Sequence, residues 1–173
     1  MRLYHFTAAE YFRGIAQEGL TVGDVPTDIH KMKGRIGVWL TNTPSPEGHG
    51  LAGRYDKAGF RIEVDIDDNA PLLARWNDWS LRNVTPETRR ILNNAATDET
   101  GQDFSDTWWV FFGWIRPDRI VGVSDTETGE AVEDWATICP EHLSLPAVSF
   151  RRKEIWQKKM LKDVRKALAD RGA

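Results

Sequence analysis

The alternation of apolar and polar residues is clearest in the segment FRIEVDI, residues 60–66. Phe60, Ile62, Val64 and Ile66 share one side of an extended chain, and the three residues between them are charged. A period of two is typical of a strand that buries one face. The segment therefore predicts a half-buried strand.

The first twenty residues predict a short strand, Arg2–His5, followed by a helix, Ala8–Glu18. Thr7 and Glu10 have the spacing of a capping box, and Gly19 is well placed to end the helix. Apolar residues recur between these limits at the spacing of one helix face: Tyr11, Phe12, Ile15 and Ala16. His5 is thus expected at the end of a strand, beside the start of a helix, where anions and nucleotides often bind.

Three more apolar runs predict strands: Ile36–Thr41, Trp108–Phe112 and Ile120–Val123. Thr85 and Pro86 have the composition of a helix start, and the helix is expected to run to about Asn93. Other segments are assigned by composition: a short helix at Leu72–Trp79, loops at Thr21–Arg35, Pro44–Gly53 and Ala95–Asp106, and a final helix at residues 151–169. That last helix is expected to present Ile155, Leu161, Val164 and Leu168 on one face.

This order of elements, a strand and a helix followed by several strands with short helical insertions, predicts an α+β fold with one mainly antiparallel sheet. The length of 173 residues suits a single domain, residues 1–173. Cys139 is the one cysteine, so no internal disulfide forms. No apolar run approaches the roughly 18 residues of a membrane span, and we expect a cytoplasmic protein.

Charge is unevenly distributed along the chain. The net charge is −3, but residues 151–173 hold nine lysines or arginines and three acids, which leaves −9 for the other 150 residues. A basic helix at residues 151–171 is suited to contact phosphates or an acidic partner, and its alternative role is that of a solvated helix face.

Common catalytic and metal-binding motifs do not occur in the sequence. There is no P-loop and no GxGxxG pattern. His30, His49 and His142 have no partner at metal-ligand spacing, so no metal site is predicted. Cys139 and His142 are three residues apart in a proline-flanked loop, and coincidence explains that spacing better than a nucleophile pair.

The stretch Tyr4-His5-Phe6-Thr7, followed by a helix and Glu18-Gly19-Leu20, resembles the N-terminal block of the ADP-ribosyltransferase superfamily. This superfamily includes poly(ADP-ribose) polymerases, DNA-targeting toxins of the DarT kind and RNA 2′-phosphotransferases. Gly37–Thr41 is similar to its second-strand block, and residues 108–123 to its late strand pair. The resemblance spans residues 1–123 and implies a split, mainly antiparallel sheet with flanking helices.

The resemblance also implies roles in binding NAD as a substrate. His5 would contact the nicotinamide-side ribose, the backbone at His5 and Phe6 would hold the carboxamide, and Thr7 would contact the adjacent ribose. Further binding roles would fall on Trp39 or Tyr55, stacked on the nicotinamide ring, on Thr41 of the second block, and on Lys33 or Arg35 at the pyrophosphate. The alternatives are structural: a core histidine, a core tryptophan and solvated cations.

One family feature is missing from its expected position. The family carries a glutamate at the start of the late strand that stabilises an oxocarbenium-like transition state, but Trp108 and Trp109 stand there. Asp106, just before the strand, and Glu63, on the polar face of residues 60–66, are the candidate catalytic carboxylates. A surface position is the alternative for each.

These observations favour an NAD-dependent ADP-ribosyltransferase that modifies a macromolecule, nucleic acid or protein. The family includes toxins, so the resemblance also implies a bacterial or phage conflict factor. Two alternatives stay open: an RNA 2′-phosphotransferase-like enzyme, and a catalytically degenerate protein that uses the pocket to bind a protein or nucleic acid.

Overall fold

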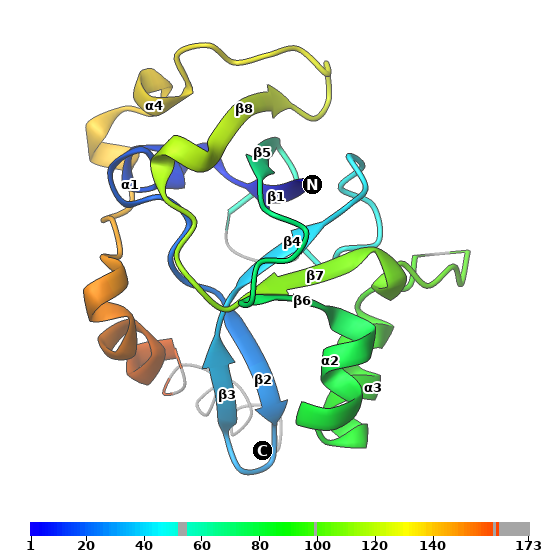
Figure 1. Ribbon diagram of the computed structural model, residues 1–173. Coiled ribbons are helices and arrows are strands. Elements are labelled where there is room, and N and C mark those ends of the chain that lie inside the picture. The colour runs from blue at the N-terminus through cyan, green and yellow to red at the C-terminus, as the bar shows by residue number, and fades with distance from the viewer. Residues whose placement is uncertain (52–54, 99, 161, 163–173) are drawn as a thin grey trace, which may run out of the picture.

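The computed structural model describes residues 1–51, 55–98, 100–160 and 162, and within them a six-stranded sheet has the order β6-β7-β4-β1-β5-β8 (Figure 1). All neighbouring strands in this sheet are antiparallel. Its strands are β1 (Arg2–Thr7), β4 (Val38–Thr41), β5 (Phe60–Asp65), β6 (Leu73–Arg75), β7 (Trp108–Phe111) and β8 (Ile120–Asp125). The predicted α+β class with a mainly antiparallel sheet is confirmed.

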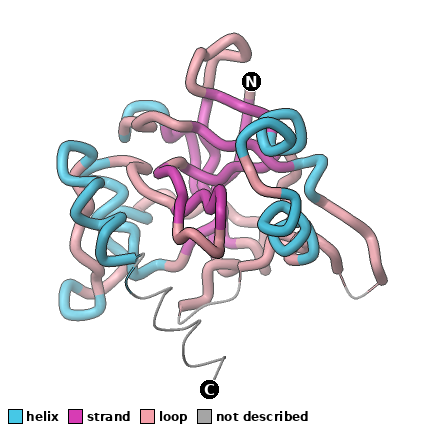
Figure 2. The backbone as a smooth tube through the Cα atoms, turned by 90° about the horizontal axis from the view of Figure 1, so that it is seen from below, coloured by secondary structure: helices cyan, strands magenta, loops and turns pink. Residues whose placement is uncertain are grey.

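Helices pack on both faces of the sheet, with the strands between them (Figure 2). The α-helices are α1 (Phe12–Glu18), α2 (Trp76–Asn83), α3 (Pro86–Asn94) and α4 (Trp135–Ile138), and residues 153–160 are also helical. Short 3-10 turns are Ala9–Tyr11, Ser105–Thr107, Pro117–Arg119, Glu141–Leu143 and Phe150–Arg152. A small hairpin of β2 (Asp24–Asp28) and β3 (Lys33–Ile36) projects from the sheet.

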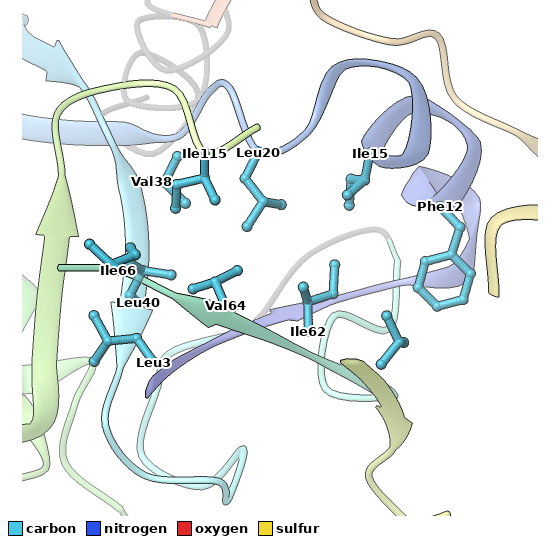
Figure 3. Packing of buried hydrophobic residues seen from close by; sticks show 11 residues of the cluster. Leu3, Phe12, Ile15, Leu20, Val38, Leu40, Ile62, Val64, Ile66 and Ile115 are labelled. Carbon is cyan, nitrogen blue, oxygen red and sulfur yellow. The ribbon is translucent and has the colours of Figure 1, made fainter. Parts of the chain in front are cut away.

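The face beneath α1 carries the larger core, which we call the α1-side core (Figure 3). Its buried residues are Leu3, Phe12, Ile15, Leu20, Val38, Leu40, Ile62, Val64, Ile66, Ile115 and Val123. Alternate residues of β5 enter this core, since Ile62 and Val64 are fully buried while Asp65 is exposed. The predicted half-buried strand is confirmed, and it buries the expected face.

The opposite face carries a second core, which we call the tryptophan core. Its buried residues are Val25, Trp76, Val84, Ala96, Trp108 and Val110. Successive residues of β7 serve the two cores, because Trp108 and Val110 enter this one whereas Trp109 and Phe111 pack against the α1-side core. A strand covered on both faces has no polar side, which explains why this segment of the sequence is continuously apolar.

Thr7 does not cap a helix, contrary to the prediction. It is the last residue of β1 and pairs with Phe60 of β5. The chain then makes the Ala9–Tyr11 turn before α1 begins, and no side chain caps either element. The six-residue ladder with β5 extends β1 past His5, so pairing overrode the local capping signal. Gly19 does end α1, at φ 76°, as predicted.

Three other local assignments need correction. The predicted loop at residues 21–35 contains the β2–β3 hairpin, and the predicted helix at 72–79 is the strand β6 followed by α2. On the final helix, Ile155 is exposed rather than buried, and its three predicted partners lie outside the described residues. In contrast, α3 begins at Pro86 as predicted, with Thr85 in the cap position.

The sheet is narrowly joined between β1 and β4. Every residue of β1 pairs with β5, whereas the ladder with β4 holds the single pair Tyr4 with Thr41. β1 and β4 therefore stop pairing at His5, and their separation leaves room in the middle of the sheet.

Candidate functional site

A cleft of about 790 Å³ opens where β1 and β4 separate. Its lining comes from several parts of the chain: residues 4–7 of β1, residues 39–41 of β4, the 19–24 segment after α1, the 49–51 loop, and residues 145–148. This volume is within the range of roughly 300–1,000 Å³ that is usual for small-molecule sites.

The C-terminal part of the described chain forms one wall of the cleft. Thr21 Oγ1 donates a hydrogen bond of 2.6 Å to the Val148 carbonyl, which ties this segment to the loop after α1. Trp156 and Met160, one helical turn apart, also line the cleft. Gln157 Nε2 donates to the Gly34 carbonyl at 3.2 Å and joins the helical segment to the hairpin.

His5 occupies the gap between the separating strands. Its Nδ1 donates to the backbone carbonyl of Trp39 on β4 at 2.9 Å, so a side chain continues the connection where the backbone ladder stops. A carbonyl oxygen only accepts hydrogen bonds, and in a neutral ring this places the proton on Nδ1. The remaining nitrogen, Nε2, is then an acceptor available to a ligand.

His5 is held neutral by its surroundings. Burial lowers its pKa below the ordinary 6.5, the carbonyl of Trp39 acts in the opposite direction, and the charge of Lys57 lowers it further. A neutral imidazole with a free lone pair is suited to accept a hydrogen bond from a hydroxyl such as that of a ribose.

His49 is the second histidine of the cleft lining, and its Nδ1 accepts a hydrogen bond whereas Nδ1 of His5 donates one. Its ring stacks on Phe6 at 5.5 Å, and its Nδ1 accepts a hydrogen bond of 2.8 Å from Trp108 Nε1. Burial lowers the pKa of His49, against a weaker effect of the Ser45 backbone. Nε2 is buried without a hydrogen-bond partner in the described part of the chain.

Asp24 brings a carboxylate to the wall of the cleft. It begins β2, where it pairs with Ile36, and its backbone carbonyl accepts a 2.6 Å hydrogen bond from Trp39 Nε1. Its Oδ1 is buried without a hydrogen-bond partner among the described residues. Burial raises the pKa of Asp24 from 3.8 to about 6.

Five residues that the sequence predicted for NAD binding line this cleft: His5, Phe6, Thr7, Trp39 and Thr41. Trp39 also packs in the tryptophan core, with its ring 4.9 Å from that of Trp76. Thr41 Oγ1 donates to Thr107 Oγ1 at 3.0 Å and accepts from the Thr43 amide. These two side chains thus combine a structural contact with a place in the cleft wall.

The other predicted site residues do not line the cleft. Arg35 lies on β3, with its guanidinium 4.3 Å from the centre of the Phe112 ring. Tyr55 packs edge-on against Tyr11 at 5.7 Å, and Tyr11 rather than Tyr55 reaches the lining. Arg35 thus contacts Trp79 and Phe112, two rings that pack against the tryptophan core.

Neither predicted catalytic carboxylate lies in the cleft lining. Asp106 is exposed and accepts a hydrogen bond of 2.6 Å from Asn77 Nδ2, beside the start of β7. Glu63 pairs with Arg2 at 2.6 Å, on the side of β5 that faces away from the α1-side core. The structure therefore does not bring either carboxylate to His5.

The lining residues that sequence reasoning missed include the one acid, the one lysine and the second histidine of the described lining: Asp24, Lys57 and His49. Asp24 lies in a stretch predicted to be a loop, and His49 in the Gly-His-Gly segment that lacks any binding motif. No local signal marks Asp24 or His49, since their contacts in the cleft wall are with residues 15 and 59 positions away in the sequence.

Among the described residues, no three histidine, cysteine or acidic side chains gather to hold a metal ion. In the same part of the chain, no helix has the length and apolar character needed to cross a membrane. No family model, curated protein or solved structure matches this chain.

Proposed function

We propose that this chain is an ADP-ribosyltransferase-like enzyme that takes NAD as its substrate in the cleft between β1 and β4. The observation that carries the proposal is the convergence of His5, Thr7 and Trp39 at one opening in the sheet. The stretches that resemble the family include the neighbouring strands β7, β4 and β1, an arrangement that supports a common site, while residues 120–123 of the third stretch lie on β8 at the edge of the sheet.

The chemical groups of the cleft suit the parts of a nicotinamide dinucleotide. His5 Nε2 offers an acceptor for a ribose hydroxyl. Trp39 and Phe6 supply aromatic surface for a flat ring. Lys57, on the same lining, has the role that the resemblance gave to Lys33 or Arg35, as the cation for phosphate oxygens.

The macromolecular target, nucleic acid or protein, belongs to this proposal as well. Lys158 and Lys159 are exposed on the helical segment whose inner side lines the cleft. An acidic target drawn to these lysines would arrive beside the opening. A toxin or conflict role is compatible with such a target and rests on the family resemblance.

The test is proton NMR of NAD mixed with the purified protein. Saturation transfer reports contact with the ligand, and free nicotinamide reports cleavage. We expect both from the wild type. His5→Asn keeps a donor at the position of Nδ1 for the Trp39 carbonyl but removes Nε2, so it is expected to lose cleavage while staying folded.

His30→Asn is the matched control, because His30 is exposed, pairs with Glu87 and is not part of the cleft lining. Undiminished cleavage by His5→Asn would contradict the assigned role of His5. Contact without nicotinamide release in the wild type would favour the catalytically degenerate binding protein. Loss of the phosphate from a 2′-phosphorylated RNA added to the same mixture with NAD would favour the phosphotransferase-like enzyme.

A further inference from the structure

The cleft contains one acidic side chain among the described residues that line it, and that residue is Asp24. Lys57 is the one basic residue among the described residues of the lining, and it forms no ion pair with Asp24 within 4.0 Å. Asp24 also takes no part in any other ion pair of the described chain. Asp24 is therefore an acidic residue of the cleft wall whose carboxylate has no compensating cation within the described part of the structure.

The carboxylate of Asp24 is poorly solvated. The side chain is half-buried, and its Oδ1 has neither water access nor a hydrogen-bond partner in the described structure. Gly34 on the opposite strand leaves the room for it, because a Cβ at Gly34 would lie 3.1 Å from Oδ1. Burying an unpaired charge costs free energy, so such a group is expected where a ligand supplies the opposite charge.

Asp24 is also held in place relative to the aromatic wall. The indole of Trp39 donates to the Asp24 carbonyl at 2.6 Å, and the backbone carbonyl of Trp39 itself accepts a hydrogen bond from His5. One tryptophan thus connects the carboxylate-bearing residue with the histidine across the opening. Strand pairing with Ile36 fixes the other side of Asp24.

We propose that Asp24 is the catalytic carboxylate of this cleft, and that it binds the positive charge of the nicotinamide ring and the charge that develops on the ribose carbon as the ring leaves. This inference rests on the proposed function. It replaces Asp106 and Glu63, which lie outside the lining. A fixed carboxylate in a site of low dielectric stabilises a developing cation without any reorganisation of solvent.

The reaction balances without a further co-reactant. The bond between the ribose C1′ and the nicotinamide nitrogen breaks, and its electron pair leaves with neutral nicotinamide. A hydroxyl or amine of the target, or water, forms the new bond to C1′ and releases its proton to solvent. Asp24 remains ionised throughout and takes up no proton.

The first experiment compares Asp24→Asn with the wild type in the NMR assay of NAD. We expect nicotinamide release to fall by about 100-fold or more, as for other single groups that stabilise transition-state charge, while saturation transfer to NAD persists. Asp118→Asn is the control, because Asp118 is exposed and pairs with Arg116 outside the cleft. Wild-type release by Asp24→Asn would overturn the proposal.

A second measurement does not depend on turnover. The carboxyl carbon of Asp24 is titrated by carbon NMR with and without 1-methylnicotinamide, a cationic probe that carries the charged pyridinium ring of NAD. A cation beside the carboxylate lowers the pKa of Asp24 from its value of about 6, so the midpoint is expected to move to lower pH. An unchanged midpoint at saturating probe would overturn the assignment.

The two measurements separate this inference from the proposed function. A wild-type protein that neither contacts nor cleaves NAD would remove the proposed function. The titration would then decide by itself whether Asp24 receives a cationic aromatic ring. Cleavage that persists in Asp24→Asn and disappears in His5→Asn would keep the enzyme and exclude this carboxylate.

Discussion

Trp108 Nε1 donates a hydrogen bond of 2.8 Å to Nδ1 of His49, at the strand position where the family resemblance called for a glutamate. An indole nitrogen only donates, so Nδ1 of His49 carries the lone pair and the neutral ring holds its proton on Nε2. His5 has the reverse state, with its proton on Nδ1. The two imidazoles of the cleft lining therefore differ: Nε2 of His5 is an acceptor, whereas Nε2 of His49 is a buried donor.

These tautomers can be measured. Long-range proton–nitrogen NMR of the labelled protein is expected to show Nδ1–H for His5 and Nε2–H for His49. Each ring is expected to take up its second proton at a lower pH than an ordinary histidine, whose pKa is 6.5, because burial lowers both pKa values. Trp108→Phe removes the donor, and we expect His49 to become a mixture of tautomers while His5 does not change. A pure Nε2–H state in that variant would contradict the role given to Trp108.

Asp24→Asn is expected to stabilise the fold at neutral pH. The pKa of Asp24 is raised to about 6, so the folded state holds a proton that the unfolded chain loses above its ordinary value of 3.8. The ionised carboxylate therefore costs stability in full above pH 6, and the cost disappears as the pH falls toward 3.8. Allowing for partial solvent access, we expect a gain of roughly 1 to 2 kcal/mol.

Urea unfolding of wild type and Asp24→Asn at pH 7.5 and pH 4 measures this gain. The difference in the free energy of unfolding should be present at the higher pH and nearly absent at the lower one. A more stable but inactive variant would show that the wild type gives up stability at this position for function. Equal stability at both pH values would mean that the carboxylate is well solvated.

Gly19→Ala is expected to destabilise the protein more than Gly129→Ala. Both glycines have positive φ angles, 76° and 75°, and Gly19 with ψ −162° lies in a region that is essentially restricted to glycine and costs another residue about 1–3 kcal/mol. A Cβ at Gly19 would lie 2.1 Å from the Ile115 carbonyl oxygen, whereas nothing lies within 4 Å of one at Gly129. We expect the clash to add about 1–3 kcal/mol.

Thermal or urea unfolding of the two variants checks this difference. The clash also falls on the bridge that Ile115 forms with Leu20, where each residue donates to the carbonyl of the other. Because Gly19 and Leu20 line the cleft, Gly19→Ala is expected to weaken NAD contact too. Equal losses of stability would show that the bridge yields easily to an added methyl group.

Charge reversal at Lys158 and Lys159 is expected to weaken binding of a nucleic-acid target. Both lysines are exposed on the helical segment beside the cleft. A plot of log K against log salt concentration has a slope that grows by about 0.7 for each phosphate contact to a single strand. If each lysine contacts a phosphate, the magnitude of this slope for a single-stranded RNA should fall by about 1.4. Fluorescence anisotropy with a labelled RNA at several salt concentrations measures this slope.

Arg90→Glu with Arg119→Glu is the matched control, because it makes the same change of net charge at exposed positions outside the cleft lining. An equal loss of affinity in this control would mean that net charge alone attracts the RNA. Salt-independent association would point to a protein target instead.

The local sequence accounts for several elements of this fold. The alternation at residues 60–66 identified β5 and its buried face, because a period of two places all the apolar side chains on one side of an extended strand. Thr85 and Pro86 marked the start of α3, and Gly19 the end of α1, because these backbone positions have residue-specific requirements. The sequence also selected His5, Thr7 and Trp39, and all three line the cleft.

The tertiary structure alone decided which charged groups join them. The hairpin of β2 and β3 sets Asp24 beside Trp39, and a contact 59 residues apart in sequence sets His49 beside Trp108. Asp106 and Glu63, chosen for their places along the chain, have partners outside the cleft. Spacing in sequence fixes neighbours within one helix or strand, whereas burial, tautomer and pKa depend on what the rest of the chain packs against each side chain.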